Sequence, residues 1–254
     1  MKGCAVPQLR VGPDVDLYYE DVGAGPPVVL VPGWPLTLDS WECQVGAFAE
    51  AGHRVVGYDR RGFGRSTRAW TGYDAATLVA DLAGLIEHLD LRSAVLVGFS
   101  SGAVEATGYL ATRGTDRVRG LVLGGPLAGA VELGRDLQAA GRWHRVAMLD
   151  DVLTRFFSVN GEIVLDEATR SHLLHSAAGS SARGTLAAID AWADPTVDLA
   201  VPDVPALVVV GDSDAVAPTR QISAPTVTIP SGPHAAHVTH PQQWNEAVLA
   251  FLAS

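Results

Sequence analysis

The chain has 254 residues, of which 48% are hydrophobic and 18% charged, so it can bury a sizeable core and is not intrinsically disordered. Its formal net charge of −10 offers no general attraction for nucleic acid or anionic lipid. With only Cys4 and Cys43, no signal peptide and no long apolar run, we expect a cytoplasmic protein without a disulfide framework, a nucleic-acid partner or a membrane partner.

Short Val-rich runs alternate with helical patterns along the chain. An alternating segment at residues 17–20 predicts an antiparallel edge strand. Nearly continuous apolar runs follow, and such runs are typical of parallel strands that are covered by helices on both faces. They are Val28–Val31, Arg54–Tyr58, Ala94–Val97, Gly120–Leu123 and Ala206–Val210.

Two segments show clear helical periodicity. Between the second and third runs, apolar residues recur at spacings of three and four from Ala75 to Leu89, and Asp74 precedes them as a candidate N-cap. A last helix is expected after Pro241, with Trp244 on its apolar face. Strands that alternate with helices predict an α/β domain with a mostly parallel sheet flanked by helices.

Residues 127–194 interrupt this alternation. They show helical patterns, several aromatic residues and no convincing strand. They are either ordinary packing helices or a helical cap, inserted between two strands, that covers a pocket at the carboxyl ends of the sheet. We expect a core of residues 1–126 and 195–254 with a cap of residues 127–194, in one structural unit.

The segment Gly98-Phe-Ser100-Ser-Gly102 joins a Val-rich strand to a helical stretch. Gly-x-Ser-x-Gly in this context indicates a nucleophile elbow, a sharp turn that exposes the serine hydroxyl. The glycines allow strand and helix to approach each other. Ser100 is therefore the candidate nucleophile, at a helix N-terminus that favours developing negative charge.

A serine hydroxyl needs a base to take its proton, and in such enzymes an acid and then a histidine follow the serine along the chain. His234 is the candidate base. Asp214 is the candidate acid that fixes the imidazole tautomer, and Asp212, one step nearer the preceding strand, is its rival. His234, His237 and His240 are spaced by three, but the His-Glu-x-x-His pattern is missing and prolines interrupt the segment, so we expect no metal site.

Two backbone N–H groups must stabilise the oxyanion that forms during acyl transfer. The candidates are the N–H of Ser101, which follows the nucleophile, and the N–H of Trp34, in the loop after the first buried strand. Pro35 has no N–H to offer. We expect the side chains of Trp34 and Phe99 to line an apolar substrate pocket.

Several motifs occur in a familiar order: Gly33-Trp-Pro-Leu36, Tyr58-Asp-Arg-Arg-Gly-Phe-Gly-Arg-Ser66, Gly98-Phe-Ser-Ser-Gly102, Gly211-Asp-Ser-Asp214 and Gly232-Pro-His234. Together they resemble the α/β-hydrolase fold, and within it the branch of cofactor-free haloperoxidases and aryl esterases, which includes lactonases and a γ-lactamase. The resemblance implies Ser100, Asp214 and His234 as a triad, Trp34 and Ser101 as oxyanion donors, and no cofactor. The preference for Asp214 over Asp212 rests on it. Members named haloperoxidases make peracids from carboxylic acids and peroxide without haem or metal.

The sequence departs from this family at three positions. Pro32 stands where a His is usual, Ser101 where Met is common, and Ala103 where a second Gly is common. We expect a stiffer oxyanion loop and a smaller, more polar pocket floor.

The stretch between Asp214 and His234 is also short, because Thr219–Pro225 leaves room for little more than one helical turn. The alternating strand Thr226–Ile229 is therefore predicted to form a thin sheet edge, either solvated or covered by a second copy in a homo-oligomer.

Taken together, the sequence predicts a serine hydrolase that cleaves a small ester or lactone through an acyl-enzyme. The same residues are compatible with opening of an amide or γ-lactam, hydrolysis of a carbon–carbon bond, or perhydrolysis. A non-catalytic small-molecule binder is the alternative from another class.

Overall fold

The computed structural model describes residues 7–197, 199–201, 203–217 and 222–254, so Cys4 lies outside the described residues. The strands are β1 (Gln8–Gly12), β2 (Val15–Gly23), β3 (Pro27–Val31), β4 (Arg54–Tyr58), β5 (Ala94–Phe99), β6 (Val118–Gly124), β7 (Ser158–Val159), β8 (Glu162–Ile163), β9 (Ala206–Gly211) and β10 (Thr226–Ile229). Eight of them form one sheet in the order β1-β2-β4-β3-β5-β6-β9-β10. The pairs β1–β2 and β2–β4 are antiparallel and the others are parallel, which confirms the expected mostly parallel sheet.

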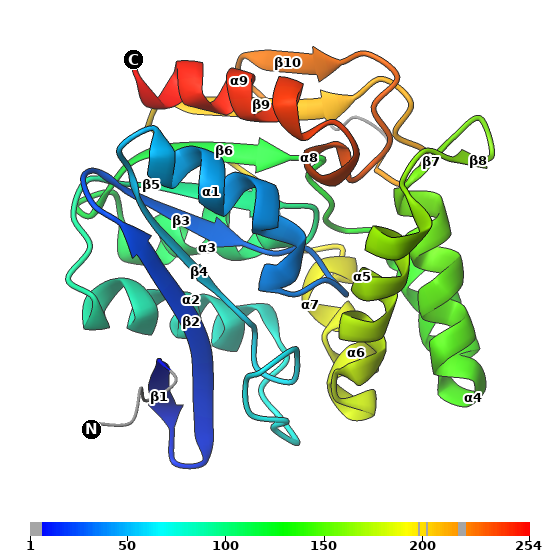
Figure 1. The fold of residues 1–254 in the computed structure, drawn as a ribbon. Coiled ribbons are helices and arrows are strands. Elements are labelled where there is room, and N and C mark those ends of the chain that lie inside the picture. The colour runs from blue at the N-terminus through cyan, green and yellow to red at the C-terminus, as the bar shows by residue number, and fades with distance from the viewer. Residues whose placement is uncertain (1–6, 198, 202, 218–221) are drawn as a thin grey trace, which may run out of the picture.

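Helices cover both faces of this sheet. They are the 3₁₀ helix η1 (Leu38–Trp41) and the α-helices α1 (Glu42–Glu50), α2 (Ala75–His88), α3 (Gly102–Arg113), α4 (Val131–Phe156), α5 (Glu167–Gly179), α6 (Ala182–Ala187), α7 (Ile189–Ala193), α8 (Ala236–Thr239) and α9 (Pro241–Leu252). Figure 1 shows α1 and α9 on one face of the sheet and α2 and α3 on the other. As predicted, Asp74 caps α2, because its carboxylate accepts from the N–H of Thr77 at 2.9 Å.

The Val-rich runs are the centre of the core. All six residues of β5 are buried, and β3 is buried after its first residue. Each strand has helices on both sides, so both faces of its pleat must be apolar. This double cover explains why the runs lack polar–apolar alternation.

The chain between β6 and β9 leaves the sheet and forms α4 to α7, beside the carboxyl ends of the parallel strands (Figure 1). Within the long helix α4 the backbone of His144 is not helical (φ −134°, ψ 49°), and this marks a kink. The region also contains the short antiparallel ribbon β7–β8, which corrects the expectation of an all-helical segment. Strands of two residues each are too short to show a periodic apolar pattern, so the sequence did not predict them.

The two edges of the sheet differ from each other. Strand β2 is not an edge strand as predicted, since β1 pairs outside it through a short hairpin. At the other edge, Thr226, Val227 and Thr228 of β10 are exposed, as the prediction of a thin edge requires. The preceding connection runs partly through residues 218–221, outside the described residues. Within the described ranges, none of the helices combines the length and apolar character needed to span a bilayer.

Candidate active site

The turn from β5 to α3 holds Ser100 in a left-handed backbone conformation, with φ 51°. Close packing around this turn requires glycine at two positions. A Cβ on Gly98 would lie 2.7 Å from the carbonyl oxygen of Gly102, and one on Gly102 would lie 2.5 Å from that of Val31. The N–H of Ser100 donates to the carbonyl of Gly124 at 2.8 Å, which ties the turn to β6. Ser100 has the backbone geometry of a nucleophile elbow.

A hydrogen-bonded chain links three of the predicted residues. His234 lies in the loop between β10 and α8, with its Nε2 2.9 Å from the Oγ of Ser100. Its Nδ1 lies 2.8 Å from Oδ2 of Asp214, in the loop after β9. The structure therefore brings Ser100, His234 and Asp214 together from three segments that are far apart in the sequence.

The carboxylate of Asp214 is held from its other side as well. Its Oδ1 accepts from the N–H of Val216 at 2.8 Å and from the N–H of Ala217 at 3.0 Å. Burial raises the pKa of Asp214, but the hydrogen bond and charge of His234 and the two N–H groups outweigh burial, so the pKa lies below its ordinary value of 3.8. This group is ionised at neutral pH.

The rival acid, Asp212, is exposed and accepts a hydrogen bond from the Oγ of its neighbour Ser213 at 3.0 Å. Its carboxylate does not take part in the hydrogen-bonded chain of His234. The structure thus places Asp214, and not Asp212, beside the imidazole.

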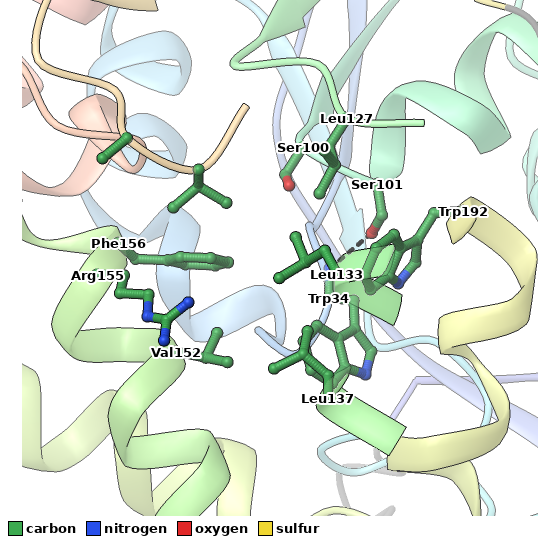
Figure 2. Close-up of a pocket in the computed structure, with 12 residues that line it drawn as sticks. Trp34, Ser100, Ser101, Leu127, Leu133, Leu137, Val152, Arg155, Phe156 and Trp192 are labelled. Carbon is green, nitrogen blue, oxygen red and sulfur yellow. Dashed lines mark hydrogen bonds between the residues drawn. The ribbon is translucent and has the colours of Figure 1, made fainter. Parts of the chain in front are cut away.

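Trp34 and Ser101 line the same cavity as Ser100, but the Trp34 N–H already donates a hydrogen bond. It donates to the Oγ of Ser101 at 2.7 Å, and both residues are buried (Figure 2). The indole Nε1–H of Trp34 donates to the carbonyl of Thr185, within α6, at 2.8 Å. Trp34 therefore connects the loop after β3 to the helices over the site.

A mostly apolar cavity of about 70 Å³ opens beside Ser100 (Figure 2). Its lining comprises Trp34, Ser100, Ser101, Leu127, Leu133, Leu137, Val152, Arg155, Phe156, Trp192, Ala215 and Val216. The cavity is small and mostly apolar, so it suits a short acyl group.

Phe99, expected to contact substrate, does not line this cavity. Its ring is buried behind the reacting groups, with its centroid 5.0 Å from that of His234 and 4.2 Å from that of His237. The side chain of a residue next to a nucleophile points away from the nucleophile's, because successive side chains at a strand end alternate in direction. Phe99 packs against the imidazole of His234 and supports it.

The helix α4 supplies cavity residues that sequence reasoning did not single out. Leu133 and Leu137 lie four residues apart before the kink, and Val152 and Phe156 lie four apart after it. Within each pair, the spacing of four places the two side chains on the same face of the helix. A search for i, i+4 apolar pairs in this segment would therefore have found them. Trp143, one of the aromatic residues of the segment, is instead 78% exposed.

The other two histidines of the spaced-by-three set have separate environments. His237 is buried against Trp41 and Phe99, where burial, with a smaller contribution from the charge of His234, lowers its pKa to about 3. His240 pairs its Nδ1 with the hydroxyl of Thr239 at 2.9 Å. Among the described residues, no group of three or more His, Cys, Asp or Glu side chains is placed to hold a metal ion.

A buried ion pair supports the loop after β3. The guanidinium of Arg60 bonds the carboxylate of Glu105, on α3, and also donates to the carbonyl of Pro32. The hydroxyl of Tyr58 donates to Glu105 at 2.6 Å. Arg60 and Glu105 are both almost fully buried. This pair fixes the loop that carries Trp34, and nothing in the sequence pattern pairs two residues 45 positions apart.

Comparison with known proteins identifies the family. A family model described as alpha/beta hydrolase fold matches residues 26–184. The chain belongs to the α/β-hydrolase fold family. It is 37% identical, over 80% of both chains, to non-heme chloroperoxidase CPO-A1 of Kitasatospora aureofaciens. The crystal structure of a bromoperoxidase from Bacillus anthracis matches 98% of this chain and 99% of its own, with 36% identity and a TM-score of 0.92.

A shorter match of 41% identity, over 43% of this chain and 40% of the relative, is to a bifunctional esterase/perhydrolase of Acinetobacter calcoaceticus. The predicted membership of the branch of cofactor-free haloperoxidases and esterases is confirmed by these relatives.

Proposed function

We propose that this α/β hydrolase is a serine hydrolase that cleaves small esters or lactones through an acyl-enzyme on Ser100. The observation that carries the proposal is the continuous chain from the Oγ of Ser100 to Nε2 of His234 at 2.9 Å and from Nδ1 of His234 to Asp214 at 2.8 Å. Nucleophile, base and orienting carboxylate are in hydrogen-bond contact, as acyl transfer requires.

In this mechanism His234 takes the proton of Ser100 as the hydroxyl oxygen attacks the carbonyl carbon. Asp214 accepts from Nδ1–H, which leaves Nε2 free to receive that proton and stabilises the imidazolium that results. The tetrahedral intermediate collapses with release of the alcohol, which takes its proton from Nε2. Water, deprotonated by His234, then attacks the acyl-enzyme and releases the acid.

The position of Ser100 favours the charge that develops in these steps. It lies at the N-terminus of the twelve-residue helix α3, where backbone N–H groups carry partial positive charge. The backbone N–H of Ser101 contributes to the oxyanion hole in this proposal, and Trp34 lines the same cavity.

The size and character of the cavity bear on the substrate. Apolar side chains line most of it, and its small volume suits a short acyl group. We therefore expect short-chain esters and small lactones to be preferred to long-chain esters.

The test is hydrolysis of an aryl acetate by the wild-type protein and by Ser100→Ala. The variant is expected to lose turnover and keep its fold, and a chelator is expected to leave wild-type turnover unchanged. Turnover by Ser100→Ala at the wild-type rate would refute the proposal. A non-catalytic binder, the alternative class, would show no turnover in either protein.

Perhydrolysis is the second candidate, because relatives bear the names chloroperoxidase, bromoperoxidase and esterase/perhydrolase. In it, hydrogen peroxide replaces water: one peroxide oxygen bonds the acyl carbon, the bond to Ser100 breaks, and the peroxide proton passes through His234 to the serine oxygen, giving a peracid. A peracid assay with acetate or an acetate ester and peroxide tests this reaction. Peracid formation at the same rate by Ser100→Ala would contradict it.

A further inference from the structure

The hydroxyl of Ser101 lies between the cavity that it shares with Ser100 and the loop after β3. Its Oγ accepts the N–H of Trp34 at 2.7 Å, and Trp34 and Ser101 are 4% and 6% exposed. Although Ser101 directly precedes α3, its side chain does not cap that helix. Its only recorded hydrogen bond within the described residues is the one that holds it against the loop after β3.

Within the described residues, only one of the three hydrogen-bonding positions of this hydroxyl is filled. A serine hydroxyl can accept two hydrogen bonds and donate one. In Ser101 the bond from Trp34 fills one acceptor position, so the hydroxyl proton must point in another direction. Ser101 lines the same cavity as Ser100, which gives that proton an open direction (Figure 2). A hydroxyl that accepts from an N–H is also polarised into a better donor.

We propose that the hydroxyl of Ser101 is itself a donor of the oxyanion hole. In this arrangement the oxyanion receives the backbone N–H and the O–H of Ser101, and the N–H of Trp34 acts by holding and polarising the hydroxyl. The inference rests on the proposed hydrolase function and assigns a role to a side chain that differs from the family's usual Met.

The alternative is that the Ser101 side chain turns away and frees the N–H of Trp34 for the oxyanion. That movement breaks a buried hydrogen bond before each turnover and leaves the hydroxyl to find other partners. Donation by the hydroxyl needs no rearrangement, and donors fixed in advance are those that lower a barrier most effectively.

The test compares Ser101→Ala with Ser101→Thr in aryl acetate hydrolysis. Loss of one oxyanion donor costs about 100-fold or more in kcat, so Ser101→Ala is expected to lose roughly that factor in kcat with little change in KM. Ser101→Thr, which keeps a hydroxyl, is expected to retain most of the activity. The matched control is Thr107→Val, which removes a buried hydroxyl of α3 that bonds only carbonyls of its own helix.

Two further readouts make the outcome decisive. An aryl boronic acid, which forms a tetrahedral adduct on a catalytic serine, is expected to bind Ser101→Ala more weakly than wild type, and the melting temperature is expected to stay within a few degrees. An alanine variant with unchanged or higher kcat would overturn the role of the hydroxyl while leaving the hydrolase proposal standing. An inactive wild-type protein would refute the hydrolase proposal itself.

A separate observation concerns the opposite wall of the cavity. Arg155, on α4, is the one charged side chain among the described residues that line it. Figure 2 shows its guanidinium between Phe156 and Val152; the residue lines the cavity and is also exposed to solvent. Within the described part of the chain, its guanidinium pairs with no carboxylate.

We infer that the preferred substrate carries a carboxylate at the end remote from its scissile carbonyl. An apolar cavity next to Ser100 accepts the short carbon chain, and the fork of donors on Arg155 matches a carboxylate. In a chain with a net charge of −10, an unpaired cation at this place attracts an anionic substrate that the rest of the surface repels. This inference also rests on the proposed function and names its substrate class.

The test pairs neutral and anionic substrates of matched length, namely 4-nitrophenyl butyrate and pentanoate against the mono-4-nitrophenyl esters of succinate and glutarate. Arg155→Gln is expected to lose about 3- to 5-fold in kcat/KM on the half esters, as for an ion pair of an exposed arginine, and little on the neutral esters. Arg142→Gln, an exposed arginine of α4 outside the cavity lining, is the control. Equal losses on both substrate classes, or none, would overturn the inference.

Discussion

Replacing Asp214 by Asn tests the role of the carboxylate without changing its shape. In the wild-type protein Oδ1 accepts from two backbone N–H groups, those of Val216 and Ala217, while Oδ2 faces Nδ1 of His234 at 2.8 Å. The amide oxygen of Asn will keep the two backbone donors, because an NH₂ group cannot accept them. Its NH₂ group must therefore face Nδ1 of His234.

This arrangement forces the imidazole into the other tautomer. An NH₂ group donates, so Nδ1 becomes the acceptor and the ring proton moves to Nε2, which lies 2.9 Å from the Oγ of Ser100. A protonated Nε2 cannot take the serine proton. The loss expected for a wrong tautomer in a Ser-His-Asp triad is about 10⁴-fold in kcat, or roughly 5 kcal/mol of transition-state stabilisation.

The assay is steady-state hydrolysis of an aryl acetate at pH 7 to 8 by wild type, Asp214→Asn and Asp212→Asn. The last variant is the control, since the Asp212 carboxylate is exposed and bonds only to Ser213 in the described structure. Wild-type-like kcat is expected for it. A large loss in Asp212→Asn together with a small loss in Asp214→Asn would refute the reasoning.

Three further predictions concern stability. Burial lowers the pKa of His237 in the folded protein to about 3, from an ordinary value of 6.5. The unfolded chain therefore binds a proton that the folded protein does not, and the free energy of unfolding falls by about 1.4 kcal/mol per pH unit as the pH drops from 6.5 towards 3. Urea titrations should show a shallower fall for His237→Phe, and equal slopes would contradict this. Glu105→Gln leaves the Arg60 guanidinium buried without its charge partner and should lower the free energy of unfolding by about 3–5 kcal/mol. Replacing both residues by apolar ones should recover much of this loss, and a double variant as unstable as the single one would argue against the reasoning. Trp34→Phe removes the donor to the Thr185 carbonyl and should cost about 1–3 kcal/mol in urea unfolding, and no measurable loss would show that this bond contributes nothing to stability.

The sheet and the elbow could be predicted from the sequence because both depend on local rules. Val-rich runs specify strands that are covered on both faces, and Gly98 and Gly102 specify a turn in which a Cβ would collide with backbone. The order of Ser100, Asp214 and His234 along the chain follows from the fold once the elbow is recognised. The hairpin partner β1 was not predicted, although its first four residues alternate polar and apolar as in a half-buried strand, because five residues are too few to stand out from the loop around them.

Contacts between distant segments that belong to no recognised motif could not be predicted from the sequence. No pattern relates Arg60 to Glu105, or shows that the N–H of Trp34 ends on the hydroxyl of Ser101, 67 positions away. Phe99 was expected to line the pocket because it is aromatic, but its ring packs against the imidazoles of His234 and His237 instead. The cavity lining depends on how α4 bends at His144, and no proline in this helix marks the bend in the sequence.

The central claim is that Ser100 carries the acyl group during turnover. The most direct measurement is an acid quench of the wild-type protein during rapid hydrolysis of an aryl acetate, followed by peptide mass spectrometry to locate the acetyl group. We predict that it is found on Ser100, that the adduct forms far more slowly in His234→Ala, and that none forms in Ser100→Ala. An acetyl group on another residue whose appearance matches the rate of turnover would contradict the mechanism.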